Sequence, residues 1–201
     1  LNFTLSKDRF STVISEVLAQ KENYGQQPAN GIKVDLEYVS ANPTGSLHLG
    51  HARGAAWGDS CARIMKKAGY DVTREYYVND AGNQITNLAL SLNARYRQAQ
   101  GIPTEIGQDG YMGKDVEEKG YELAKEYPQT YLEPTEENLK FFKKEGIKFE
   151  LDKIRKDLDR YRVHFDVWSS EQSIRDAGKV EAAINELNEK GKKKKKDGAL
   201  W

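Results

Sequence analysis

The fold of this 201-residue chain is decided by residues 37–51, which read EYVSANPTGSLHLGH. Residues 33–39 lead into this stretch with alternating apolar and polar side chains, a pattern that predicts a strand. Residues 40–46 are turn formers without an apolar period. After the second histidine, apolar side chains recur at helical spacing up to Gly69, at Trp57, Cys61, Ile64 and Ala68. The stretch is therefore predicted to be the loop between the carboxyl end of a strand and the start of a helix.

A second strand, loop and helix follow. Residues 71–78 alternate again, residues 79–82 break the strand, and residues 85–92 place apolar side chains on one helical face. Residues 8–21 carry another helical stripe before the first strand. Strand, helix and strand in this order form a βαβ unit, the building block of a parallel, doubly wound sheet. We therefore predict an α/β fold.

The second half of the chain has a different composition. Glycines and a proline disfavour regular secondary structure in residues 101–113, and the residues beyond them are rich in charged side chains. The expected elements are helices at residues 116–127, 136–145, 149–161 and 176–190, and short strands at residues 163–168 and 198–201. This pattern indicates a second, mainly helical domain.

Composition excludes several classes of protein. The 31 Lys and Arg residues balance 31 Asp and Glu residues, so a nucleic-acid partner would need a local basic cluster, and the densest is Lys192–Lys196. No apolar run approaches the roughly 20 residues of a membrane span, and the N-terminus lacks the pattern of a secretory signal. One cysteine, Cys61, and three histidines form neither an internal disulfide nor a zinc cluster. We expect a soluble, cytoplasmic protein that holds no metal of its own.

The residues His48-Leu49-Gly50-His51 carry the clearest chemical signal. They stand at the carboxyl end of a strand, where open α/β sheets bind ligands, and at a helix start, whose free N–H groups suit a phosphate. Two imidazoles three residues apart can stabilise charge that develops during displacement at phosphorus. The alternative is that both histidines are surface residues or helix caps. Neither the dinucleotide-binding nor the Walker glycine pattern occurs in the chain.

The sequence resembles one known family on these residues. His48-Leu49-Gly50-His51 is similar to the "HIGH" signature of class I aminoacyl-tRNA synthetases, and residues 37–45 resemble the form found in arginyl-tRNA synthetases. The resemblance continues through residues 50–54, 58–59, 76–84, 165–171 and 197–201. It covers nearly the whole chain, which we expect to be an N-terminal, first-half fragment.

The resemblance implies a Rossmann-like nucleotide-binding half-domain of the HIGH type, built on a parallel sheet, with a mainly helical connective insertion. Residues 1–25 would be the end of an N-terminal extra domain, residues 26–104 the first half of the catalytic domain, and residues 105–201 part of the insertion. Such a fragment lacks the second signature loop and the anticodon-binding domain, so we expect it to be inactive alone. Some members carry a lysine shortly before the two histidines, where this chain has Gly45, which places the lysine of the intact protein in the downstream loop.

The implied activity is that of an aminoacyl-tRNA ligase. The full protein would activate L-arginine with ATP, giving arginyl-adenylate and pyrophosphate, and would then transfer arginine to the 3′-terminal adenosine of tRNA(Arg). Mg²⁺ would arrive with the nucleotide, held largely by phosphate oxygens. No membrane partner is implied, and the full-length form would be a monomer.

The resemblance also assigns roles to residues. The ATP-binding group would be Thr44, His48, Gly50 and His51, and its two histidines would be catalytic. The arginine-binding group would be Glu37, Ser40, Asn42 and Gln84. A carboxylate such as Glu37 suits arginine because it pairs with a guanidinium through two charge-assisted hydrogen bonds. Without the motif, Glu37 would be an outward strand carboxylate and Asn42 a plain turn residue.

Two other functions remain open at this point. A small nucleotidyltransferase with an HxGH site would be complete at this length. A non-catalytic tRNA-binding module could use Lys192–Lys196 as a phosphate-binding patch, although a run of five lysines is more often a solvated loop.

Overall fold

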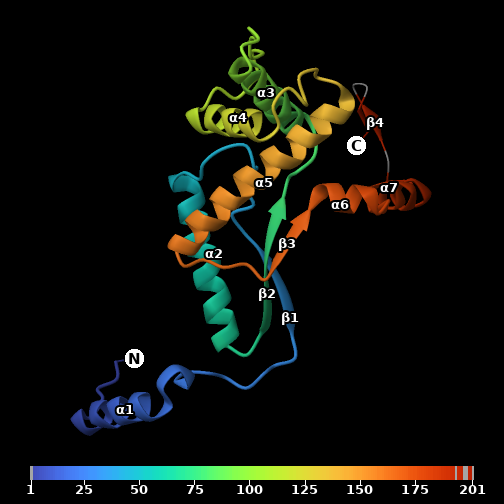
Figure 1. The fold of residues 1–201 in the computed structure, drawn as a ribbon. Coiled ribbons are helices and arrows are strands. Elements are labelled where there is room, and N and C mark those ends of the chain that lie inside the picture. Colours follow the sequence, from blue (N-terminus) through green and yellow to red (C-terminus); the bar gives the residue numbers. More distant parts are fainter. Residues whose placement is uncertain (1, 193, 197–198, 201) are drawn as a thin grey trace.

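The computed structural model describes residues 2–192, 194–196 and 199–200 (Figure 1). The helices among these residues are α1 Lys7–Gln20, η1 Lys21–Asn23 (a 3₁₀ turn), α2 Leu49–Lys67, α3 Asn83–Ala99, α4 Lys114–Glu126, α5 Glu136–Arg160, α6 Glu171–Asp176 and α7 Lys179–Glu189. The strands are β1 Lys33–Glu37, β2 Asp71–Val78, β3 Val167–Ser170, β4 Lys195–Lys196 and β5 Ala199–Leu200.

Three strands form a parallel sheet with β2 in the centre and β1 and β3 on either side. The register places Glu37 of β1 beside Glu75 of β2, so β1 ends where β2 continues for three more residues. The βαβ unit that the alternating pattern predicts is therefore confirmed, and with it the α/β fold class. The carboxyl ends of β1 and β2 lie at the same edge of the sheet, where the loop that carries the histidines begins (Figure 1).

Two apolar clusters hold the molecule together, and α5 contributes to both. The first lies over the sheet and joins Tyr76 and Val78 of β2 to Ile154 and Leu158 near the end of α5. The second lies among the helices of the upper group in Figure 1, and its members are Leu88, Ala89, Leu92, Tyr96, Val116, Leu123, Ala124 and Phe142. Helix α5 thus runs from the helical part of the molecule to the sheet.

Helix α5 is continuous over 25 residues, whereas the sequence pattern predicts two helices with a break near residue 146. That prediction is wrong because Gly146 lies inside the helical cluster. A Cβ at this position would lie 2.9 Å from Leu92 Cδ1 and 3.1 Å from Leu88 Cδ2 of α3. The glycine permits close packing of two helices here, and tertiary contact outweighs its poor helix propensity.

The apolar stripe of α2 is largely exposed. Trp57 is 74% exposed and Ile64 68% exposed, while the buried residues of this helix are small or polar: Ala55, Gly58, Asp59 and Ala62. Cys61, which belongs to the same stripe, is only partly buried. Helix α1 likewise buries none of its residues. Helical spacing identifies an apolar face correctly but cannot tell which neighbour covers it.

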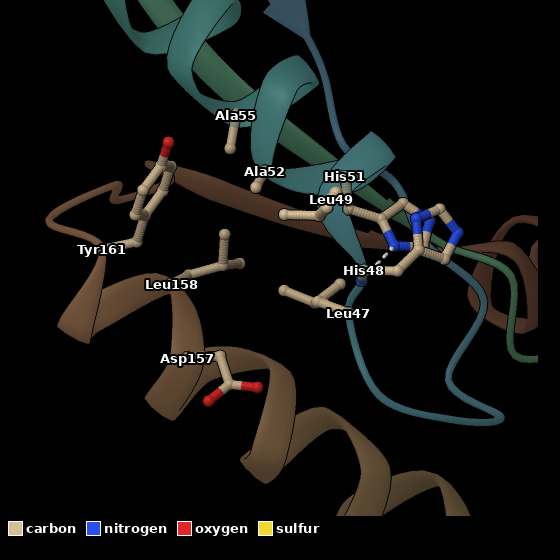
Figure 2. Close-up of a pocket in the computed structure, with 9 residues that line it drawn as sticks. All are labelled: Leu47, His48, Leu49, His51, Ala52, Ala55, Asp157, Leu158 and Tyr161. Carbon is tan, nitrogen blue, oxygen red and sulfur yellow. Dashed lines mark hydrogen bonds between the residues drawn. The ribbon is translucent and has the colours of Figure 1, made fainter.

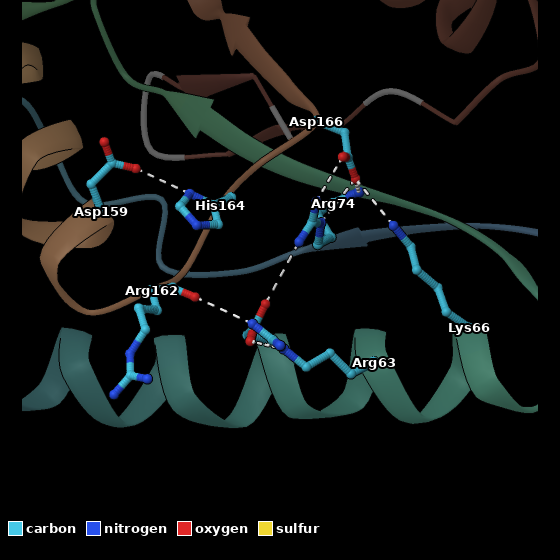
Figure 3. A network of polar contacts seen from close by, with 8 residues as sticks. Arg63, Lys66, Arg74, Asp159, Arg162, His164 and Asp166 are labelled. Atoms are coloured by element: carbon cyan, nitrogen blue, oxygen red, sulfur yellow. Dashed lines mark hydrogen bonds and ion pairs between the residues drawn. The ribbon is translucent and has the colours of Figure 1, made fainter. Parts of the chain in front are cut away.

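A network of ion pairs fastens α2 to the sheet (Figure 3). The guanidinium of Arg74 on β2 donates to Asp166 through Nε at 2.9 Å and Nη2 at 2.8 Å. Its Nη1 lies 3.7 Å from Oδ1 of Asp59 on α2, and Arg63 Nε donates to the other carboxylate oxygen of Asp59 at 2.5 Å. The hydrogen bond from Arg74 holds the pKa of the Asp166 carboxyl well below its ordinary value.

The last strand of the parallel sheet comes from the second half of the sequence. Strand β3 begins at Val167, later than the expected strand at residues 163–168, and Tyr76 of β2 pairs with Trp168 in its register. Part of the expected strand at residues 198–201 is present as β5, which pairs antiparallel with β4. Residues 198 and 201 lie outside the described residues. Strand β4 contains two lysines of the run 192–196, and Lys193 lies outside the described part. No helix in the described ranges is long and apolar enough to cross a membrane.

Candidate functional site

The loop after β1 is held in a strained conformation. Val39 and Ser40 both have positive φ, at 68° and 40°, and a β-branched residue such as valine rarely adopts this region. The buried hydroxyl of Tyr76 donates to the carbonyl oxygen of Ala41 at 2.9 Å. The backbone N–H of Tyr77 donates to Ser40 Oγ at 3.1 Å. Strand β2 thus fixes the path of the loop that leads to the histidines.

His48 and His51 form one unit at the start of α2. His48 is the N-cap, and its Nδ1 accepts from the backbone N–H of Gly50 at 3.1 Å. Nδ1 of His51 accepts in turn from the backbone N–H of His48 at 3.2 Å. The two rings stack with centroids 3.8 Å apart. The alternative role of helix cap is therefore realised, by both imidazoles together.

This capping arrangement decides the protonation of both rings. An Nδ1 that accepts a hydrogen bond carries no proton, so each neutral imidazole bears its proton on Nε2. Desolvation lowers the pKa of His51, and the neighbouring His48 lowers it further. With both Nδ1 atoms accepting, the pair presents Nε2–H donors beside the positive end of the α2 dipole.

A cavity of about 470 Å³ lies beside the histidine pair, between the start of α2 and the end of α5 (Figure 2). Its wall is mostly apolar, and it is lined by Leu47, His48, Leu49, His51, Ala52, Ala55, Asp157, Leu158 and Tyr161. The last three residues come from α5 and the turn that follows it, more than a hundred positions after the histidine loop. Nothing in the local sequence of α5 identifies them as neighbours of the site.

The residues assigned to arginine form two hydrogen-bonded groups. Ser40 Oγ donates to Glu37 Oε1 at 2.6 Å, so one oxygen of this carboxylate is already engaged. Asn42 Nδ2 donates to Gln84 Oε1 at 2.8 Å, and Asn42 Oδ1 accepts from Asn79 at 3.1 Å. The structure thus brings together side chains 42 positions apart in the sequence. Asn79 joins this amide cluster, although the residues assigned to arginine do not include it.

The structure does not place all assigned residues in one cavity. Glu37 lines a second cavity of about 560 Å³ between β1 and α2, with Leu36, Tyr38, Arg53, Trp57 and Cys61 among its neighbours. Thr44 lies in the turn before the histidines, where its N–H donates to the carbonyl oxygen of Asn42 at 2.8 Å. Gly50 lies between the two histidines in the sequence, and a Cβ at this position would lie 2.9 Å from Cε1 of the His48 ring. Among the described residues, no group of three or more His, Cys, Asp or Glu is arranged to hold a metal ion.

Comparison with known proteins places this arrangement in a family. A family model described as class I tRNA synthetases (R), catalytic domain, matches residues 13–201. The arginine–tRNA ligase of Bacillus pumilus is 51% identical over the whole chain, which covers 36% of that relative. The corresponding ligase of Bacillus subtilis is 50% identical, again with 36% of its length covered. The chain therefore spans little more than a third of the curated relatives it matches.

Solved structures agree with the sequence comparison. A structure described as an arginyl-tRNA synthetase from Campylobacter jejuni superimposes with a TM-score of 0.83 at 31% identity, covering 98% of this chain and 43% of that one. The arginyl-tRNA synthetase of Plasmodium falciparum shares the fold, with a TM-score of 0.61 at 17% identity, 98% of this chain and 35% of that one. The sequence motif, the βαβ sheet and the family match agree: this chain belongs to the arginyl group of the class I tRNA synthetases, whose catalytic-domain model matches residues 13–201.

Proposed function

We propose that this chain is the part of an arginyl-tRNA synthetase that orients the phosphates of ATP and the side chain of arginine. The full protein activates L-arginine with ATP, releases pyrophosphate, and transfers arginine from the adenylate to tRNA(Arg). The observation that carries the proposal is the capped histidine pair. Both Nδ1 atoms are engaged by backbone N–H groups, so both Nε2–H groups are available to a ligand.

The pair suits the chemistry of adenylate formation. Attack of the arginine carboxylate on the α-phosphorus of ATP builds negative charge on the phosphate oxygens. Donors that are already oriented stabilise this charge without first having to reorganise. Mg²⁺ would arrive with the nucleotide, held largely by its phosphate oxygens. Thr44 and Gly50 contribute through the loop backbone, which lies against the histidines.

The arginine side of the site is built from the ends of β1 and β2. Glu37 supplies the carboxylate for the guanidinium, and its engaged oxygen is oriented by Ser40. Asn42 and Gln84 supply amide groups for the ammonium or carboxylate of the amino acid, and their mutual hydrogen bond fixes which atoms remain free. A bidentate pair with the guanidinium of arginine uses both carboxylate oxygens of Glu37. Ser40 must therefore give up its hydrogen bond to Oε1 of Glu37 or share this oxygen with arginine.

The remaining parts of the proposal follow from family membership. The single cysteine is consistent with a reducing cytoplasm, and we propose that the full-length enzyme is a cytoplasmic monomer without a membrane partner. The chain alone is expected to show negligible arginine-dependent pyrophosphate exchange, because it spans 36% of the relatives in which that activity is named.

Replacement of Glu37 by Gln tests arginine as the substrate. Glu37→Gln keeps the size of the side chain but removes its charge, so kcat/KM for arginine should fall roughly 30- to 1000-fold in the full-length enzyme. KM for ATP should change little, because the histidines lie on a different element. Citrulline and canavanine, with less or weaker positive charge, should lose less than arginine does. The measurement is steady-state pyrophosphate exchange with both substrates varied.

Asp35 provides a matched control for this test. It lies two residues earlier on the same face of β1 and is also exposed. Asp35→Asn removes one charge from the same strand and should leave both kinetic constants for arginine within about threefold of wild type. A Glu37→Gln enzyme that behaves like Asp35→Asn would show that Glu37 is an ordinary strand carboxylate and would refute its role in arginine recognition.

A further inference from the structure

The two halves of the proposed site lie on different elements, and one contact sets their separation. Glu37 ends β1, whereas His48 and His51 begin α2. Between them, the side chain of Tyr38 packs directly against the backbone of Gly58 in α2. A Cβ built on Gly58 would lie 2.2 Å from Tyr38 Cγ and 2.4 Å from Tyr38 Cδ2. Because a carbon needs at least about 3.4 Å, only glycine permits this approach.

Tyr38 is held from its other side as well. Its ring lies 4.5 Å from that of Phe165, measured between centroids, so it cannot simply retreat from a bulkier helix. Its hydroxyl oxygen is buried and has no hydrogen-bond partner among the described residues. Burial, followed by the nearby charge of Asp59, raises the pKa of Tyr38 to about 12. The ring of Tyr38 is therefore held by packing against Gly58 and Phe165, and no hydrogen bond of its hydroxyl among the described residues contributes.

Helix α2 contacts the sheet through the residue after Gly58 as well. Asp59 is buried, and its Oδ1 lies 3.7 Å from the guanidinium of Arg74 on β2. This ion pair opposes rotation of α2 about its own axis. We therefore expect an added methyl group at Gly58 to move the helix away from β1.

We propose that Tyr38 and Gly58 are positioning residues that set the distance between the phosphate-binding histidines of α2 and the arginine-binding carboxylate of β1. The inference rests on the proposed function. It predicts that an added methyl group at Gly58 displaces the histidine pair relative to Glu37 by about 1 Å, while each substrate still meets its own residues. A misplacement of this size can cost about 100-fold in rate.

The test compares two variants that each enlarge one residue of α2 in the full-length enzyme. Gly58→Ala should lower kcat for arginine-dependent pyrophosphate exchange about 30- to 100-fold per titrated active site, with Kd for arginine and for ATP each within threefold of wild type. Ala56→Ser is the control, because Ala56 is exposed on the same helix and lines neither the histidine cavity nor the Glu37 cavity. It adds one heavy atom away from both cavities and should leave kcat unchanged.

Further variants separate positioning from a general loss of structure. Tyr38→Phe keeps the ring without its hydroxyl and should lower kcat less than Tyr38→Leu does. Tyr38→Leu should lower kcat about tenfold, and combining it with Gly58→Ala should restore part of the rate lost in Gly58→Ala, because the smaller side chain makes room for the methyl group. These comparisons remain decisive even if Gly58→Ala alone folds poorly.

The outcomes are distinct. Equal kcat in Gly58→Ala and Ala56→Ser, or loss of activity in Tyr38→Phe as large as in Tyr38→Leu, overturns the positioning role while leaving the proposed function intact. A fall in substrate-binding stoichiometry with unchanged kcat per active site also overturns it, because that result indicates a purely structural role. A wild-type enzyme without arginine-dependent exchange refutes the proposed function and this inference with it.

Discussion

Replacement of Lys153 by Met should destabilise the chain in a pH-dependent way. Lys153 on α5 donates to Glu150 Oε2 at 2.9 Å and also pairs with Asp115 on α4. Glu150 is completely buried, and its other oxygen, Oε1, has no hydrogen-bond partner among the described residues. The lysine is the cation that compensates this carboxylate, so the variant leaves a negative charge buried and unpaired.

The magnitude follows from burial. Removing one partner of a buried ion pair typically costs about 3–5 kcal/mol. The Lys153 side chain is 24% exposed, so water compensates part of the loss, and we expect about 2–3 kcal/mol at pH 8. In a protein of this size that corresponds to a fall in Tm of roughly 4–12 °C.

The pH dependence is the sharper part of the prediction. Burial raises the pKa of Glu150 above its ordinary value even with Lys153 present, and removal of the lysine raises it further. A carboxyl whose pKa is raised by folding favours the folded state when protonated, and this contribution is lost as pH rises above the unfolded pKa of 4.5. The deficit of Lys153→Met should therefore be larger at pH 8 than at pH 5.

Urea unfolding followed by circular dichroism at the two pH values measures both quantities. Lys156→Met, an exposed lysine on the same helix, is the control and should change stability by less than about 0.5 kcal/mol. The double variant Lys153→Met/Glu150→Leu should recover most of the loss, since no charge is then left buried. A deficit for Lys153→Met that is equal at both pH values would refute the reasoning.

Two further predictions concern the network in Figure 3 and the histidine cap. The hydrogen bond from Arg74 depresses the pKa of Asp166 in the folded state. The ionised Asp166 therefore stabilises the fold above its unfolded pKa of 3.8, and this stabilisation is lost as pH falls through and below that value. Asp166→Asn should remove this part of the acid sensitivity, measured as urea midpoints between pH 3 and 6. His48→Asn keeps a cap acceptor but loses the Nε2–H donor, so kcat of the full-length enzyme should fall roughly 100-fold while Tm stays within about 2 °C, whereas His48→Ala should also lose about 1 kcal/mol of stability. A Tm loss in His48→Asn equal to that in His48→Ala would argue against the cap geometry.

Much of the fold was predictable because periodicity is a local property. The alternation over residues 33–39 and 71–78 predicts β1 and β2, and the apolar spacing between them predicts α2. Parallel pairing follows from the order of these elements. The boundary between the helical part and the sheet was less predictable, since β3 lies more than 80 residues after β2 yet pairs with it.

The position of the candidate site was predictable to the same degree, whereas the binding and catalytic roles of its residues, the histidines included, remain predictions. Two histidines around a glycine at a helix start indicate phosphate binding because residue type and helix position are both readable from the chain. The assigned roles of Glu37 and Gln84 in arginine binding remain predictions. What no pattern revealed was the hydrogen bonding of each imidazole, because a tautomer depends on which backbone N–H group lies within reach of Nδ1.

The sequence by itself determined β1, β2, the histidine loop and the helix that begins there, since these depend on side chains a few positions apart. Only the tertiary structure decided that α5 continues through Gly146, that its far end with Tyr161 lines the histidine cavity, and that Tyr38 packs on Gly58. Each of these depends on contact between residues far apart in the chain. Such contacts are set by the packing of whole elements, and packing leaves no period in a single sequence to reveal it.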